Sequence, residues 1–135
     1  MKKPRKVIIL GDPGLDGAVA VGLALASPHL EVTALLASAG NVGADQATKN
    51  MQAILARLDP ARWPRLGVAP SVSYDMDGRA WHGSNGLLGL DWPSAPPLNA
   101  QPSDRLLVEL ARKHPGEISL LNLGPCTVLA QALDR

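Results

Sequence analysis

Aromatic residues are scarce in this chain of 135 residues, which has three Trp, one Tyr and no Phe. Proteins that bind single-stranded nucleic acid stack its bases on several aromatic side chains, so the composition argues against that class. The same shortage means that the core must be packed from Ala, Leu, Val and Ile. A core of this kind is typical of strands covered by Ala-rich helices.

Cysteine and net charge are also nearly absent. The single cysteine, Cys126, excludes an internal disulfide framework and a thiolate metal site, and it favours a reducing, cytoplasmic location. The formal charge of +1 creates no overall field that would attract nucleic acid or an anionic membrane. The apolar run at residues 7–10 is too short for a signal peptide or a membrane span. We therefore expect neither nucleic acid nor membrane as a partner.

The pattern of apolar residues predicts a single α/β domain over residues 1–135. Hydrophobic residues make up 46% of the chain, which is enough to close one core. Strand, helix and strand follow each other at the spacing of a βαβ crossover, so we expect an open, mostly parallel, Rossmann-like sheet flanked by helices. The predicted strands are residues 6–10, 31–38, 65–69 and 117–123, and the predicted helices are residues 18–27, 44–58, 104–113 and 126–134.

Three local expectations accompany this outline. The first helix is almost entirely small or aliphatic and is expected to be buried, as is the last strand. Ser103 suits the N-cap of the third helix. Residues 70–102 have no periodicity and are rich in Gly, Pro, Ser, Asn and Asp, so we expect a long loop that is either functional or disordered.

Polar residues follow the predicted strands at their carboxyl ends, where open parallel sheets bind ligands. Asp12 and Asp16 follow the first strand, Asn41 the second, His82 lies in the long loop, and the turn at residues 123–127 follows the last strand. The topology predicts that they converge. The glycine-rich turns lack both GxGxxG and a terminal Lys-Ser/Thr, so neither a dinucleotide site nor a P-loop is indicated.

Each of these residues also has a structural interpretation. An Asp before a helix is most often an N-cap or a partner of the helix dipole, which residue type alone favours for Asp16. Asp12 before Pro13 suits a turn. Alternatively, two carboxylates four residues apart across a turn can bind a cation, activate water or hold sugar hydroxyls. A lone His82 is more often an ordinary loop residue than a catalyst.

The cysteine and the tryptophans are equally open. Cys126 stands at a helix start where a thiolate would be stabilised, although a small buried cysteine is the commoner state. Trp63, Trp81 and Trp92 suit a base-binding pocket and a cap over the core equally well.

Four motifs in order give the chain a family resemblance. Nucleoside hydrolases carry DxDPGxDD, a strand ending in GN, an HGxxG loop and a TGPLTN-like turn. This chain has LGDPGLDG at residues 10–17, GN at 40–41, HGSNGL at 82–87 and LGPCTVLAQAL at 123–133. The set spans nearly the whole chain, which thus resembles the N-terminal half of the inosine-uridine preferring nucleoside hydrolases, truncated relative to that family.

The resemblance implies hydrolysis of the N-glycosidic bond of ribonucleosides with the help of Ca²⁺. By position, Asp12 matches the metal-binding aspartate that acts as general base, and Leu123 matches the residue whose backbone carbonyl reaches calcium. Asp16 and Asn41 match residues that hold the ribose, and His82 matches the histidine of the substrate loop. The implied ligand is a small nucleoside or ribose-like molecule.

The chain also departs from the family pattern. Leu10 and Gly17 stand where the family motif has aspartates. In the family, the aspartate at the position of Gly17 is a principal calcium ligand. Val128 replaces the asparagine of the final turn, and the family draws another aspartate from its C-terminal half.

Three hypotheses therefore remain. The first is an N-ribosyl hydrolase. The second is a non-catalytic, ribose-binding descendant or a self-associating half-fold, and the third is an unrelated α/β domain. We expect a homo-oligomer, since a sheet that stops after four or five strands leaves an edge that favours pairing.

Overall fold

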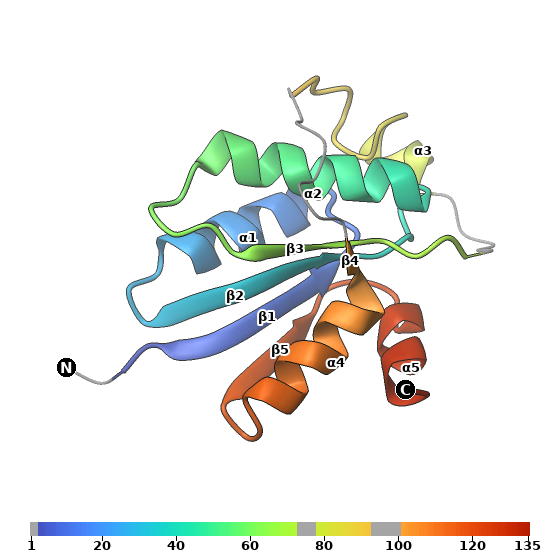
Figure 1. The fold of residues 1–135 in the computed structure, drawn as a ribbon. Coiled ribbons are helices and arrows are strands. Elements are labelled where there is room, and N and C mark those ends of the chain that lie inside the picture. The colour runs from blue at the N-terminus through green and yellow to red at the C-terminus, as the bar shows by residue number, and fades with distance from the viewer. Residues whose placement is uncertain (1–2, 73–77, 93–100) are drawn as a thin grey trace.

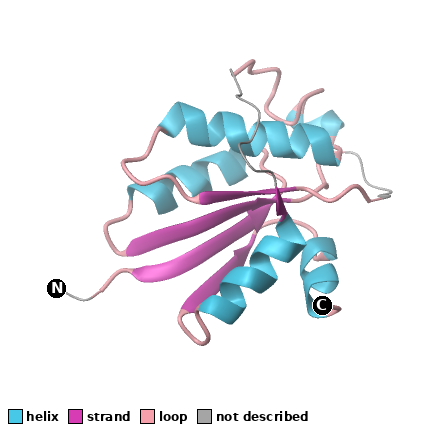
Figure 2. Cartoon of the chain, viewed as in Figure 1, coloured by secondary structure: helices cyan, strands magenta, loops and turns pink. Residues whose placement is uncertain are grey.

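The computed structural model describes residues 3–72, 78–92 and 101–135, which form a parallel sheet between two layers of helices (Figures 1 and 2). The elements are β1 (Arg5–Gly11), α1 (Leu15–Ala26), β2 (Leu30–Ala37), α2 (Ala44–Leu58), β3 (Arg65–Val68), α3 (Arg79–His82), β4 (Gln101–Pro102), α4 (Ser103–Lys113), β5 (Ile118–Asn122) and α5 (Thr127–Leu133).

The strands lie in the order β4-β3-β2-β1-β5, and every neighbouring pair is parallel. Helices α1 and α2 cover one face of the sheet, while α4 and α5 cover the other (Figure 1). The predicted parallel α/β architecture is therefore confirmed. Since all strands point the same way, their carboxyl ends form one edge, where the loops after β1, β2 and β5 meet.

Strand β1 divides the core between the two faces, because alternate side chains of a strand point in opposite directions. Val7 and Ile9 pack with α1 and α2, whereas Ile8 and Leu10 pack with α4 and α5. All four are buried, and burial of such a side chain is worth about 1.5–3 kcal/mol. This strand therefore anchors the turn that follows it.

Strand β2 contains one extra residue relative to β1. Val7 pairs with Val32, but Ile8 pairs with Ala34, so Thr33 is left over at a bulge. The Thr33 hydroxyl donates a hydrogen bond to the Val7 carbonyl at 3.1 Å. A bulge of this kind shifts the alternation by one residue.

Several predicted details were wrong. The first helix begins at Leu15 rather than at residue 18, and its only buried residues are Val21 and Ala24, because the helix lies on the sheet with its other side open. Strand β5 is partly exposed, including Leu120 and Leu121, because it pairs only with β1 among the described strands.

The predicted loop at residues 70–102 was also wrong in part. It contains the short helix α3 and the two-residue strand β4, while residues 73–77 and 93–100 of the loop lie outside the described part of the chain. Ser103 does not cap α4, because Pro102 holds that position and the Ser103 hydroxyl instead donates to the Ala37 carbonyl at 2.7 Å. Across the described ranges, no helix is both long and apolar enough to cross a membrane.

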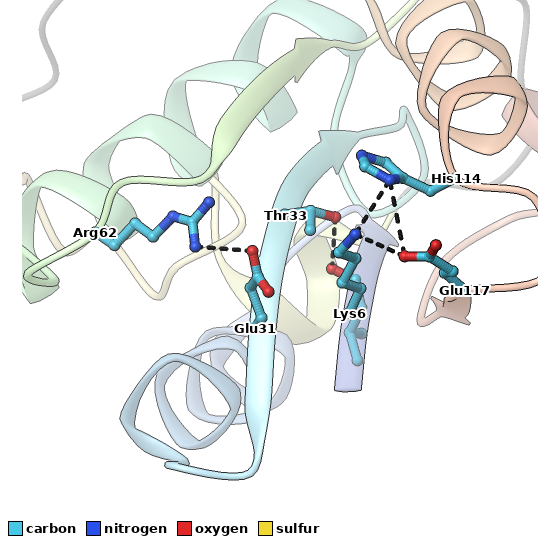
Figure 3. Close-up of polar contacts among 7 residues, drawn as sticks. Lys6, Glu31, Thr33, Arg62, His114 and Glu117 are labelled. Atoms are coloured by element: carbon cyan, nitrogen blue, oxygen red, sulfur yellow. Dashed lines mark hydrogen bonds and ion pairs between the residues drawn. The ribbon is translucent and has the colours of Figure 1, made fainter. Parts of the chain in front are cut away.

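Charged groups join the loops at the amino ends of the strands (Figure 3). Lys6 Nζ lies 3.1 Å from Nδ1 of His114 and donates to Glu117 at 2.8 Å. The hydrogen bond from Lys6 and its positive charge hold the pKa of Glu117 below its usual range. Arg62 pairs with Glu31 at 2.8 Å. Salt bridges thus link the loops at this edge, and the candidate site lies at the opposite edge.

Candidate functional site

The turn between β1 and α1 forms the floor of a cleft of about 200 Å³. Asp12 is 8% exposed, whereas Asp16 is exposed in the first turn of α1. Asp16 is not the N-cap, because Gly14 holds that position and no side chain caps the helix, but its place in the first turn of α1 agrees with the interpretation as a partner of the helix dipole. Residues that line the cleft include Gly11, Asp12, Pro13, Gly14, Asp16, Gly17, Asn41, Met51 and Leu123.

Asp12 is held by the loop that follows β2. The Asn41 backbone N–H donates to Asp12 Oδ2 at 2.6 Å, and the Asn41 side-chain amide donates to the Asp12 carbonyl at 3.0 Å. The topology-based prediction that these two residues converge is thus observed. One N–H of the Asn41 side-chain amide braces the turn, so its amide oxygen remains available to accept a hydrogen bond from a ligand.

Burial is the largest influence on the Asp12 carboxyl and raises its pKa above the usual range. Hydrogen bonds from the backbone N–H groups of Asn41 and of Asp12 itself act in the opposite direction. The nearby Asp16 raises the pKa further and His82 lowers it. The net rise makes the carboxylate a stronger base than an exposed one, which suits proton abstraction.

Two glycines leave room for this carboxylate, and sequence reasoning missed both roles. A Cβ atom at Gly40 would overlap Asp12 Oδ2 and lie 2.6 Å from Cγ. A Cβ at Gly124 would lie 2.8 Å from Asp12 Oδ1. The pairs Gly40–Asn41 and Gly124–Pro125 were visible as motifs, but the need for glycine arises from contacts across strands.

The His82 side chain contacts the turn between β1 and α1 at Gly14. A Cβ at Gly14 would lie 2.6 Å from His82 Nδ1 and 3.1 Å from Asp16 Oδ1, so the imidazole and that carboxylate approach the same point beside Gly14. His82 ends α3, and its carbonyl accepts the Leu88 N–H at 2.6 Å. The structure therefore places Asp12, Asp16, Asn41 and Leu123 along the cleft, and His82 beside Gly14 of the same turn.

Asn85 organises the HGSNGL loop and was not singled out from the sequence. Its Oδ1 accepts the N–H groups of Leu87 and Gly89 at 3.0 Å, and its amide donates to the Leu90 carbonyl at 2.9 Å. The Asn50 amide of α2 donates to the Asn85 carbonyl at 2.7 Å. The asparagine of this motif therefore shapes the loop and fastens it to α2.

The turn after β5 completes the cleft. The Leu123 N–H donates to the Leu10 carbonyl at 2.8 Å, which extends the pairing of β5 with β1 and brings Leu123 beside the turn. Cys126 is exposed and accepts a hydrogen bond from Asn122 at 3.5 Å, so the expectation of a buried cysteine was wrong. Cys126 holds the N-cap position of α5, at the surface of the described structure.

The tryptophans separate into different environments. Trp92 packs against the core, which agrees with the cap interpretation. Trp63 is exposed in the loop between α2 and β3 and donates to Asp59 at 3.1 Å. Trp81 is 83% exposed in α3 next to His82. Among the described residues that line the cleft, none is a tryptophan.

The donor set near Asp12 does not fit a complete calcium site. Ca²⁺ takes six to eight oxygen ligands. Within the described ranges, no group of three or more His, Cys, Asp or Glu side chains is placed to hold a metal. Asp12 Oδ2 already accepts the Asn41 N–H, and Gly17 offers no carboxylate. We therefore derive no reaction step through calcium.

The sequence matches the model of the inosine-uridine preferring nucleoside hydrolases over residues 7–135. The chain belongs to this family. The expectation from the four motifs is thereby confirmed, and the hypothesis of an unrelated α/β domain is wrong.

Relatives within the nucleoside hydrolase family include uridine nucleosidase 1 of Arabidopsis thaliana, 35% identical over 98% of this chain and 41% of its own. Pyrimidine-specific ribonucleoside hydrolase RihA of Salmonella arizonae is 36% identical over 95% and 42%. The plant nucleoside hydrolase PpNRh1 superposes with a TM-score of 0.84 at 32% identity, covering 98% of this chain and 43% of that one. The chain thus spans about two fifths of the length of these relatives.

Proposed function

We propose that this chain supplies the ribose-side part of a nucleoside hydrolase site, with Asp12 as the general base. Asp12 takes one proton from a water molecule, whose oxygen bonds to C1′ of the ribose. The bond between C1′ and the base nitrogen breaks, and the base leaves with the electron pair and acquires a proton. The observation that carries this proposal is the buried carboxylate, held in one orientation at the floor of the cleft.

Ribose is the part of the substrate that the cleft is proposed to recognise. Asp16 and the free amide oxygen of Asn41 are suited to accept hydrogen bonds from ribose hydroxyls, and His82 closes the same side. The names of relatives mention uridine, pyrimidines and, for a hydrolase of Gardnerella vaginalis, a preference for purines. Ribose is common to these substrates, so we assign no base preference.

A second candidate, ribose binding without turnover, is favoured by the glycine at position 17. The test incubates the purified chain with uridine and with inosine and measures free ribose, alongside saturation-transfer NMR of the ribose protons. Release of ribose supports the hydrolase. Saturation transfer without release supports the binding protein, and the absence of both contradicts each proposal.

Substitution of Gly17 by aspartate is expected to increase the affinity for Ca²⁺ about tenfold, since affinity rises with the number of charged oxygen ligands. A Cβ at Gly17 would meet only Pro13 Cβ, at 3.5 Å, so the side chain fits beside the cleft. Calorimetric titration with CaCl₂ measures the change, and Gly17→Ala is the matched control. Equal heats for the two variants would show that position 17 does not reach the Asp12 carboxylate.

We also propose that the chain self-associates through β5. This strand is at the edge of the described sheet, and Leu120, Leu121, Leu123 and Leu133 are exposed on β5 and the segments that follow it. Exposed strand edges with apolar side chains favour pairing with another chain. Sedimentation velocity at micromolar concentration is expected to show a dimer or larger species, whereas a monomer would contradict the proposal.

A further inference from the structure

Ser38, directly after β2, has a side chain that the cleft residues named so far do not explain. It is 0% exposed, and its Oγ has no hydrogen-bond partner in the part of the chain that the structure describes. Its backbone is hydrogen-bonded to β1, because the Ser38 N–H donates to the Gly11 carbonyl at 2.9 Å. Buried hydroxyls almost always have a hydrogen-bond partner, so an unpaired one indicates that a small movement or another group supplies the missing hydrogen bond.

The strand register places Ser38 beside the proposed base. Gly11 pairs with Ala37, so Asp12 is next to Ser38 one residue further along the same two strands. Leu10 pairs with Asn122, so on the other side Asp12 is next to Gly124. Neighbouring residues in parallel register point toward the same face of the sheet. Ser38, Asp12 and Gly124 therefore lie in one row just beyond the carboxyl ends of β2, β1 and β5.

The position of Gly124 shows where the two polar side chains point. A Cβ at Gly124 would lie 2.8 Å from Asp12 Oδ1, 2.9 Å from Ser38 Oγ and 3.1 Å from the Asp12 backbone nitrogen. Ser38 Oγ and Asp12 Oδ1 thus both lie close to Gly124. The other carboxylate oxygen, Oδ2, is already held by the Asn41 N–H.

We propose that Ser38 is a positioning residue whose hydroxyl donates a hydrogen bond to Asp12 Oδ1 across the space above Gly124. Rotation about the Ser38 Cα–Cβ bond completes this bond, because Ser38 Oγ and Asp12 Oδ1 lie 2.9 Å and 2.8 Å from the same point beside Gly124. The carboxylate is then held at both oxygens, by Ser38 on one side and Asn41 on the other. Its orientation toward the cleft is set before any ligand arrives.

The test compares Ser38→Ala with the unmodified chain by ¹³C NMR of the Asp12 carboxyl carbon at one fixed pH, with the resonance assigned by its loss in Asp12→Asn. We expect Ser38→Ala to shift this resonance and to lower Tm, because a used hydrogen bond is lost. Ser119→Ala in β5, which replaces a serine paired with Val7 and away from the turn, should leave the resonance unchanged. An unchanged Asp12 resonance in Ser38→Ala, or a raised Tm, would overturn the proposal, since removal of a truly unpaired buried hydroxyl stabilises a protein.

A kinetic measurement rests on the proposed hydrolase function. Ser38→Ala is expected to lower kcat for uridine roughly tenfold with little change in KM, because a poorly oriented base slows the reaction without weakening binding. Ser38→Thr, which keeps the hydroxyl, should recover most of the loss. If the chain releases no ribose, the proposed hydrolase function is contradicted. The NMR comparison does not depend on turnover, so it still tests the role of Ser38.

Discussion

Replacement of Asp12 by asparagine is expected to lower kcat for nucleoside hydrolysis by about 10²- to 10⁴-fold, the usual contribution of a general base. Asparagine keeps the shape of the side chain, and its amide oxygen still accepts the Asn41 N–H, but it takes up no proton. The folded chain should remain at least as stable. Because burial raises the pKa of Asp12 in the folded state, ionised Asp12 opposes folding above its unfolded pKa, and asparagine removes that cost.

The measurement is ribose release from uridine, with Tm recorded for the same samples. Asp134→Asn is the matched control, because Asp134 is an exposed carboxylate at the end of α5 and should leave kcat unchanged. If Asp12→Asn hydrolyses uridine as fast as the unmodified chain, another group abstracts the proton and the assignment of Asp12 is wrong.

Alanine at Gly40 is expected to abolish the arrangement around Asp12. The added Cβ would overlap Asp12 Oδ2 and lie 3.0 Å from Pro125 Cδ, so the carboxylate or the loop after β2 must move. We expect a loss of about 1–3 kcal/mol in the free energy of unfolding, as for other overpacked sites. Displacement of the base by about 1 Å should lower kcat about 100-fold.

The matched control is Gly22→Ala, which makes the same substitution inside α1 and away from Asp12. Its Cβ would meet only the Leu58 methyl groups, at 3.8 Å, so we expect a gain of about 0.5–1 kcal/mol from the better helix former. Urea denaturation measures both variants. Normal stability and activity in Gly40→Ala would mean that the carboxylate does not occupy the space beside Gly40.

The sequence predicted the parts of the fold that depend on local pattern. The continuous aliphatic run of β1 indicated a strand buried on both faces, and the crossover spacing indicated a parallel sheet. Parallel strands end at one edge, so the meeting of Asp12 with Asn41 followed from topology. Burial was predicted less well, since the exposure of β5 depends on which neighbours it has and not on its own residues.

The groups that shape the site were beyond sequence reasoning for a related reason. Ser38, Gly40 and Gly124 are ordinary residues in their own segments. Their importance comes from the space around one carboxylate, which is set by the register of three strands. Nothing in a single segment reveals such a contact.

The extra residue at Thr33 separates the two ends of β2 from each other. Before Thr33, β2 pairs with β1 in one register, and after Thr33 the register is shifted by one residue. We therefore expect the bulge to accommodate an insertion or deletion near residues 27–30. A residue gained or lost there would alter the bulge and leave the pairing of Gly11 with Ala37 intact. The register of β2 with β1 at the amino edge of the sheet is therefore separate from the register that aligns Ser38, Asp12 and Gly124 at the carboxyl edge.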